Sequence, residues 1–570
     1  MNKLHRAPLP RSPYLLHAGK ASWSGHERLV AAALGDGCAS NIVEAIRDSL
    51  HYYSTDPSVA FGYSFDKEIG LQNIETAANK VTHDSNSPVD LAILDEGIPI
   101  ARPDVLPRLK SVWVQDGAAT SESARFLPFG ADFPGTTVQQ LLKAWKADPL
   151  DHAYNIVAHS TARGMTTRRR LQRFSTHGAA VLGELVRGAG SQHPIIAVNL
   201  PPEIVRDTSG STLPYYALLG LLYAMAISRR SADSQSEQRS VVATLSYGIL
   251  AGPKDGSSLF EEALDLICDP NSDFGNVGPV HCVLPMGNGR QSRAIAQLSR
   301  EQARDGLAVR LPPADSTPTF VEIYSERTLP KTVVLQRRGD EQIILQVPSD
   351  QNAEVETGGF SLRQVNKGVL LAIPPTFTTA VWRGTDGKHQ RPVTVKPGDL
   401  LIRFPEATDS LNLCIQRDDS LDGLRSGGRQ ARFLDDSYET HDTSGRPLET
   451  DTNFRSLITR SGTINALACG EHVWRSGGTY LRHSQAAVPY SGMDWAGSSR
   501  NLYGDAMGPC DQSPFLSGRS VDSVAGGAPA LMSGTSLAAP YLARKIANYI
   551  SANGIHSSRS DIAAHLRAET

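Results

Sequence analysis

The stretch Val89–Gly97 reads VDLAILDEG, a short apolar run that ends in Asp-Glu-Gly. A run of this length before a turn signal is typical of a buried β-strand. Comparable runs follow in PIIAVNL, SVVATLSYG and PVHCVLPMGNG, and helical patterns such as TTVQQLLKAWKAD and SSLFEEALDLIC lie between them. Strands that alternate with helices in this way predict an α/β fold, with a doubly wound parallel sheet and helices on both of its faces.

The pattern changes from Thr319 onward, where short β-rich runs such as KTVVLQRR, EQIILQV and GVLLAIPP are separated by Gly, Pro and Asp turns. About seven or eight strands at this spacing predict an inserted all-β, sandwich-like domain. The α/β signals then resume and end in the helix SLAAPYLARKIANYISANG. The predicted organisation is an N-terminal extension of regulatory or prodomain-like character at 1–85, an α/β domain in two parts at 86–315 and 456–570, the inserted domain at 316–417, and a linker or mobile loop at 418–455.

Composition excludes several classes of protein. The 570 residues carry a net charge of −3, which argues against nucleic acid as a partner because such proteins present a basic face. The longest apolar run, Ala217–Ile227, is too short for a membrane helix, which needs about 20 residues, and the N-terminus has no secretory apolar segment. We therefore expect a cytoplasmic protein with no membrane partner. The six cysteines are widely spaced and form no CxxC pair, which argues against a disulfide framework or zinc site: Cys38, Cys268, Cys282, Cys414, Cys469 and Cys510.

Ser536 is a candidate nucleophile in the segment Ser533–Pro540, which reads SGTSLAAP. Gly534 leaves room for a substrate backbone, and the small Ala538 and Ala539 let the following helix pack closely. At a helix start the N–H of Ser536 is among the unsatisfied donors and can face an oxyanion. The alternative is a plain helix N-cap, which is the commoner role of a serine at such a position.

A nucleophilic serine needs a base, a carboxylate that orients the base, and donors for the oxyanion. His177, in STHGAAVLGELVRG, begins a helix whose first two turns are unusually small. Asp95 ends a predicted strand, at the sheet edge where catalytic groups gather in open parallel sheets. Asn288, in VLPMGNGR, can project its amide into a cleft. The alternatives are a core or capping histidine, a turn-forming aspartate and a Gly-Asn-Gly turn.

The segments AILDEGI, STHGAAVLGEL, VLPMGNG and SGTSLAAP resemble the signature blocks of the subtilisin-like serine proteases (subtilases), and they occur in that family's order. The resemblance covers residues 85–310 and 455–570. It implies that Asp95, His177 and Ser536 form a catalytic triad, and that Asn288 and the N–H of Ser536 form the oxyanion hole. It also implies that Ser246, Tyr247 and Gly248 pair with an extended peptide substrate. The residues implied to line the pocket for the side chain before the scissile bond are Leu284, Pro285, Met286 and Gly287.

The chain departs from the family pattern in three ways, the first being Ala180, where the family's histidine block often carries a second histidine. Glu96 follows Asp95 where the family usually has Ser or Thr, and Asn288 and Ser536 are unusually far apart in sequence, which the inserted strands explain. The sequence predicts a serine endopeptidase that acts on proteins or peptides through an acyl-enzyme. The alternative is a regulated or inactive subtilase scaffold that binds a regulatory protein partner through its β-rich insertion. We expect no cofactor or metal; many subtilases bind calcium, but no acidic cluster here identifies a site.

Overall fold

The computed structural model describes residues 87–116, 127–138, 171–188, 193–230, 238–349, 353–419, 427–524 and 529–568, together with Leu29 and Ala33. Within these ranges it leaves out 103, 172, 211–212, 273–276, 366, 380–381, 384–388, 391–392 and 454. Apart from Leu29 and Ala33, the expected N-terminal extension at 1–85 lies outside the described residues. Leu29 and Ala33 are fully buried against one face of the main sheet.

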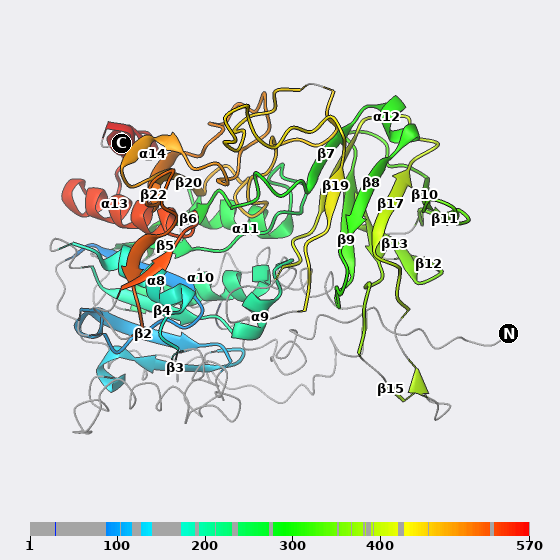
Figure 1. Cartoon of the computed structure of the whole chain (residues 1–570). Helices are drawn as coiled ribbons and strands as arrows, with labels where there is room; N and C mark the ends of the chain where they lie inside the picture. Colours follow the sequence, from blue (N-terminus) through cyan, green and yellow to red (C-terminus); the bar gives the residue numbers. More distant parts are fainter. Residues whose placement is uncertain are drawn as a thin grey trace.

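The main sheet has nine strands and is mostly parallel (Figure 1). Its centre is β1 (Val89–Asp95), which pairs in parallel with β4 (Ile195–Asn199) on one side and β5 (Arg239–Leu245) on the other. Beyond β4 lie β2 (Leu109–Val114) and the antiparallel edge strand β3 (Ala131–Pro134). Beyond β5 lie β6 (Val277–Pro285) and β20 (Trp474–Tyr480), and β20 also pairs with β21 (His483–Ala487) and β22 (Ala506–Asp511).

Helices cover both faces of this sheet. Successive residues of a strand point to opposite faces, so in β1 Leu91 and Ile93 enter one core whereas Ala92 and Leu94 enter the other. This double burial explains why the four residues from Leu91 to Leu94 are all apolar rather than alternating with polar ones. One face is covered by α10 (Leu213–Arg230) and α11 (Leu259–Cys268), and near them lies the short α9 (Pro202–Arg206). The other is covered by α8 (His177–Val186), α13 (Ala538–Asn553) and α14 (Arg559–Ala568). None of the described helices is both long and apolar enough to cross a membrane.

Two further sheets, built only from antiparallel pairs, pack around a core of their own beside the α/β part (Figure 1). The first has the order β11-β10-β17-β8-β19 and the second β12-β13-β14-β9-β18-β7. The first sheet consists of β8 (Leu307–Leu311), β10 (Thr332–Gln336), β11 (Ile343–Gln346), β17 (Gly398–Arg403) and β19 (Arg432–Leu434). The second consists of β7 (Ile295–Leu298), β9 (Thr319–Tyr324), β12 (Glu354–Thr357), β13 (Phe360–Val365), β14 (Gly368–Ile373) and β18 (Leu411–Ile415).

Four smaller elements complete the described structure. They are the 3₁₀ helix η3 (Leu106–Arg108), the helix α12 (Arg300–Asp305) and the two-stranded pairs β15 (Trp382–Arg383) with β16 (His389–Gln390) and β23 (Arg519–Asp522) with β24 (Pro529–Met532). The α/β core with additional antiparallel sheets agrees with the class of fold expected from the sequence.

The antiparallel sheets begin earlier and end later in the chain than the expected 316–417 segment. Strands β7 and β8 precede that segment, and β19 follows it within the expected linker at 418–455. The described part of this linker makes specific contacts: Asp451 pairs with Arg460 at 2.9 Å, and Tyr438 lies under the same guanidinium at 4.5 Å. Ala296 and Ile458 form an isolated antiparallel bridge, so the chain enters and leaves the β-rich part at one place.

Candidate functional site

The candidate residues lie at the carboxyl edge of the main sheet. Asp95 is the last residue of β1, and Ser246 directly follows β5. The chain order reverses at β1, because β2 and β4 lie on one side of it and β5, β6 and β20 on the other. In open α/β sheets the crevice at such a reversal is the usual position of a binding site.

Asp95 and His177 form a direct pair. The imidazole Nδ1 lies 2.8 Å from Oδ1 and 3.0 Å from Oδ2 of the carboxylate. Asp95 is fully buried, whereas the His177 side chain is 21% exposed. His177 is the first residue of α8, whose N-cap Thr176 accepts the N–H of Ala179 at 3.1 Å. The N–H of Gly178 donates to the carbonyl of Glu96 at 3.0 Å, which joins the helix start to the end of β1.

Two more donors reach the Asp95 carboxylate. The backbone N–H of Glu96 donates to Oδ1 at 2.8 Å, and the hydroxyl of Tyr247 donates to the same oxygen at 2.7 Å. The Tyr247 ring also stacks on the imidazole of His177, with 4.9 Å between ring centroids and 30° between the planes. Each donor compensates for the hydration that a buried carboxylate loses.

Ser536 lies in the turn directly before α13. The helix begins at Ala538 with Leu537 as its N-cap, and no side chain caps it. The simple capping interpretation of Ser536 is therefore wrong, and Ser536 precedes the first turn rather than lying in it. Its hydroxyl instead donates to the carbonyl of Ser246 at 2.9 Å.

Asn288 follows β6 and contacts the nucleophile segment through Thr535. Both the backbone N–H and the hydroxyl of Thr535 donate to Oδ1 of Asn288, each at 2.9 Å. Because that oxygen is engaged as an acceptor, the Nδ2 end of the amide is the donor. A Cβ at Gly534 would lie 3.1 Å from Nδ2, and the φ of +136° at Gly534 disfavours other residues there.

The short segment after β5 links Asp95, His177 and Ser536, and Thr535 links Asn288 to them. Ser246 accepts the Ser536 hydroxyl, and the adjacent Tyr247 contacts both Asp95 and His177. Asn288 is joined to the residue preceding Ser536. A hydroxyl, an imidazole with an oriented carboxylate, and an amide donor are the groups that acyl transfer requires.

The expected substrate-binding residues occupy less uniform environments. Three of them, Ser246, Tyr247 and Gly248, lie just beyond the end of β5. The backbone there is hydrogen-bonded by the side chain of Asn465. Its Nδ2 donates to the Tyr247 carbonyl at 3.1 Å, and its Oδ1 accepts the Ile249 N–H, also at 3.1 Å.

In the second segment, Leu284 and Pro285 end β6, and Leu284 is fully buried in the main core. The Met286 side chain is also fully buried, against Ile464 and Cys469, and Gly287 has φ +89°. The side chains of Leu284 and Met286 thus both point into the interior, Leu284 into the main core and Met286 into a separate small cluster.

Sequence reasoning missed three contributions to this site. It gave Thr535 no part in the site, it assigned Tyr247 only a backbone role, and it did not single out Asn465. The Nδ2 of Asn465 also donates to the Pro285 carbonyl at 3.0 Å, so this one amide joins the two expected substrate-binding segments. An Asn flanked by apolar residues in TINALAC was the available signal, because a buried amide needs several partners.

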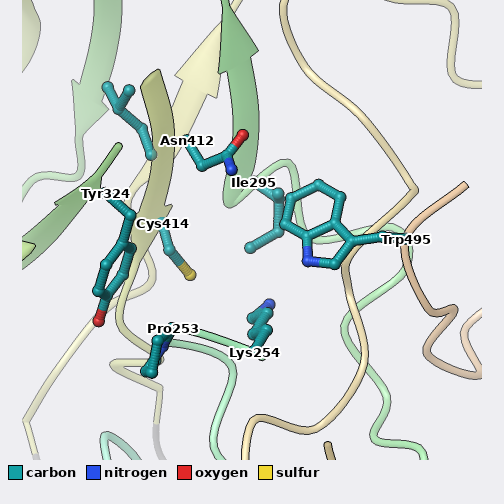
Figure 2. A pocket seen from close by; sticks show the side chains of 9 residues that line it. Pro253, Lys254, Ile295, Tyr324, Asn412, Cys414 and Trp495 are labelled. Atoms are coloured by element: carbon teal, nitrogen blue, oxygen red, sulfur yellow. The ribbon is translucent and has the colours of Figure 1, made fainter. Parts of the chain in front are cut away.

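A small cavity lies away from these residues, between the loop after β5 and the antiparallel sheets (Figure 2). Lys254 is buried in its wall beside Cys414 and Trp495, and its ammonium donates to the Gly462 carbonyl. Burial lowers the pKa of Lys254. None of the candidate catalytic residues lines this cavity. The part of the chain that the structure describes contains no group of three His, Cys, Asp or Glu side chains arranged to hold a metal ion.

Comparisons with known proteins relate the fold to a protease. No family model matches the chain, and no curated protein matches it. Among solved structures, the chain is similar to the CspB protease of Clostridium perfringens, with a TM-score of 0.54 and 14% sequence identity, over 84% of this chain and 86% of that chain. At this identity the likeness concerns the fold alone: the chain has a fold similar to that of a known protease.

Proposed function

We propose that this protein is a serine endopeptidase of the subtilisin-like type that cleaves peptide bonds in proteins or peptides. The observation that carries the proposal is the His177–Asp95 pair, with 2.8 Å between Nδ1 and Oδ1. The Ser536 hydroxyl donates to the carbonyl of Ser246, and the next residue, Tyr247, contacts both members of the pair. The similarity of the fold to that of a protease supports peptidase activity.

The proposed reaction begins with a change at Ser536. A hydroxyl has one proton to donate, and here it goes to the Ser246 carbonyl. For attack, the hydroxyl turns toward Nε2 of His177, and Nε2 accepts its proton. The Nδ1–H group of His177 keeps its hydrogen bond to the Asp95 carboxylate throughout. The released Ser246 carbonyl can then accept an N–H from the bound peptide. Substrate binding and alignment of the nucleophile are therefore coupled at one carbonyl.

The later steps use the donors that the proposal assigns to the oxyanion hole. The Ser536 oxygen attacks the peptide carbonyl, and the oxyanion forms facing Nδ2 of Asn288 and the N–H of Ser536. The imidazolium of His177 gives its proton to the leaving amine, and an acyl-enzyme on Ser536 remains. Water activated by His177 then hydrolyses this ester and regenerates the serine.

Labelling with a fluorophosphonate probe and cleavage of a peptide library test the proposal. We expect the wild-type chain to be labelled at Ser536 and Ser536→Ala to lose both labelling and cleavage. The matched control is Ser533→Ala, which removes an exposed hydroxyl three residues earlier in the same loop and should leave both signals intact. Full cleavage by Ser536→Ala, or labelling at another serine, would contradict the proposal.

A further inference from the structure

Tyr247 touches both members of the Asp95–His177 pair, through two different parts of its side chain. Its hydroxyl donates to Oδ1 of Asp95 at 2.7 Å, and its ring stacks on the imidazole at 4.9 Å. We propose that Tyr247 is a positioning residue that fixes the orientation of Asp95 and His177 for proton transfer. This inference rests on the proposed function.

The hydroxyl of Tyr247 is a permanent donor. Burial, together with the nearby carboxylates of Asp95 and Glu96, raises the pKa of this phenol well above its ordinary value. It therefore stays protonated at neutral pH. Asp95 Oδ1 accepts this hydroxyl, the Glu96 N–H and the Nδ1–H of His177. With these donors on one oxygen, the carboxylate is held against rotation.

The ring of Tyr247 restrains the other partner. An interplanar angle of 30° at 4.9 Å is a stacked arrangement, which opposes tilting of the imidazole about its Cβ–Cγ bond. The imidazolium that forms during the reaction also gains from the electron-rich face of the phenol ring. The hydroxyl and the ring thus act on different atoms and can be separated by substitution.

The backbone of the same residue is itself fixed. Nδ2 of Asn465 donates to the Tyr247 carbonyl at 3.1 Å, and the preceding Ser246 carbonyl holds the Ser536 hydroxyl. A single short segment therefore carries the contact to the nucleophile and the contacts to the acid–base pair. Because Asn465 holds the Tyr247 backbone independently of its side chain, a loosened Tyr247 side chain should affect proton transfer rather than substrate affinity.

Two variants separate the roles. Tyr247→Phe keeps the ring and removes the hydroxyl, whereas Tyr247→Leu removes both. Loss of a hydrogen bond to a charged group predicts a fall in kcat of about 10–100-fold for Tyr247→Phe, with KM changed by less than about twofold. Tyr247→Leu should lose more. The matched control is Tyr438→Phe in the antiparallel part, whose buried hydroxyl has no hydrogen-bond partner among the described residues; its kinetics should equal those of the wild type.

A second readout does not require catalysis. Among the titratable side chains that contact His177 in the described structure, Asp95 and Tyr247 face the imidazole, and the Glu96 carboxylate accepts the backbone N–H of His177 at 3.4 Å. Without the phenol proton, Oδ1 of Asp95 carries more negative charge, so the imidazolium is stabilised and the pKa of His177 rises. We expect Tyr247→Phe to raise this pKa, measured by NMR of ¹⁵N-histidine-labelled protein, and to move the acidic limb of the kcat/KM profile to higher pH.

The outcomes discriminate clearly. Unchanged kcat and an unchanged His177 pKa in folded Tyr247→Phe would overturn the inference, as would a rise in KM alone. If Tyr247→Phe does not fold, the same comparison is made with Tyr247→Leu. If the wild type neither cleaves peptides nor reacts with the fluorophosphonate, the proposed function fails, but the NMR titration still decides whether Tyr247 positions the pair.

Discussion

Thr535 decides which end of the Asn288 amide faces outward. Its N–H and its hydroxyl both donate to Oδ1, and Thr535 is fully buried, so this arrangement is held by the start of the last helix. The amide would otherwise be free to flip, since its two ends have similar size. A residue next to the candidate nucleophile thus sets the orientation of a donor far away in sequence.

Asn288→Ala tests this donor. Loss of one oxyanion donor predicts a fall in kcat of about 10²–10³-fold with little change in KM, because the interaction forms in the transition state. Steady-state kinetics on a peptide identified by library profiling measure both constants. The matched control is Asn271→Ala, which lies in an exposed turn after α11 and should change neither. A rise in KM at constant kcat would indicate a substrate-binding role instead.

At the scale of elements, α8 is shaped to place His177 against the end of β1. Gly178, Ala179 and Ala180 are buried, and the Gly178 N–H bonds to the carbonyl that follows Asp95. A Cβ at Gly178 would lie only 2.4 Å from this carbonyl oxygen. The small residues seen in the sequence are therefore required for close approach of helix and strand.

Gly178→Ala should move the start of α8 away from β1. Alanine favours helix by about 1 kcal/mol over glycine, but overpacking against a fixed backbone atom costs about 1–3 kcal/mol. We expect a lower thermal midpoint and a kcat reduced at least about tenfold, because displacement of a catalytic group by an ångström is costly.

The control on the same helix is Gly183→Ala. The Cβ there would lie 2.7 Å from Oδ2 and 2.9 Å from Cβ of Asp522, so this variant also crowds the helix, but at its contact with β23 rather than with β1. Its kcat should stay close to that of the wild type. Equal losses in the two variants would show that general helix packing, rather than the position of His177, determines activity.

Strand β6 carries a buried histidine that links stability to pH. The Nδ1 of His281 accepts the indole N–H of Trp474 at 3.2 Å, and burial, with a smaller effect of Arg559, lowers the pKa of His281 to about 4. The unfolded chain takes up this proton near pH 6.5, so it binds more protons than the folded chain between pH 6.5 and pH 4. The contribution of neutral His281 to the free energy of unfolding is fully present above pH 6.5. It decreases as the pH falls and is lost once the pH has passed through about 4.

His281→Gln should reduce this acid sensitivity. The shift corresponds to about 3 kcal/mol lost between pH 6.5 and pH 4. Free energies of unfolding from urea titrations at several pH values measure this loss. The decrease in the wild type minus the decrease in His281→Gln gives the contribution of His281, because other titrating groups are common to both proteins. Parallel pH curves for the two proteins would refute the assignment.

At the scale of the whole molecule, the segment after β5 joins the two parts of the fold. Tyr247 contacts Asp95 in the α/β part, whereas Leu250 and Ala251 are buried in the core of the antiparallel sheets. Leu250 also lies beside the loop of the oxyanion candidate, since a Cβ at Gly289 would meet its Cδ1 at 2.7 Å. The core of the antiparallel sheets therefore packs against the 246–250 segment and the loop that carries Asn288.

Leu250→Ala tests this support. Removing a buried leucine should cost about 2–4 kcal/mol of stability, and we expect a reduced kcat/KM because the 246–250 segment loosens. The matched control is Leu335→Ala, a leucine of β10 buried in the same core but away from the site. It should lose similar stability in chemical unfolding and keep kcat/KM. Equal kinetic losses in both variants would contradict a specific link to the site.

The boundary of the inserted part shows where sequence reasoning stopped. The runs IAQL in β7 and LAVRL in β8 are as short and apolar as the strands of the main sheet, and α12 lies between them as a helix would in a βαβ unit. Local pattern therefore favoured the α/β part. Only the pairing partners, β18 for β7 and β17 and β19 for β8, identify these strands as members of the antiparallel sheets.

The sequence by itself determined the alternation of strands and helices and the residue types of the candidate site, because both depend on local periodicity and on small residues beside a few polar ones. The tertiary structure decided which atoms meet. Tyr247 and Asp95 are 152 residues apart in sequence, and Thr535 and Asn288 are 247 apart. Their hydrogen bonds arise only when both faces of the sheet are packed and the strand ends lie side by side. No local pattern carries that information, since hydrogen-bond direction depends on positions that are set by contacts between distant segments.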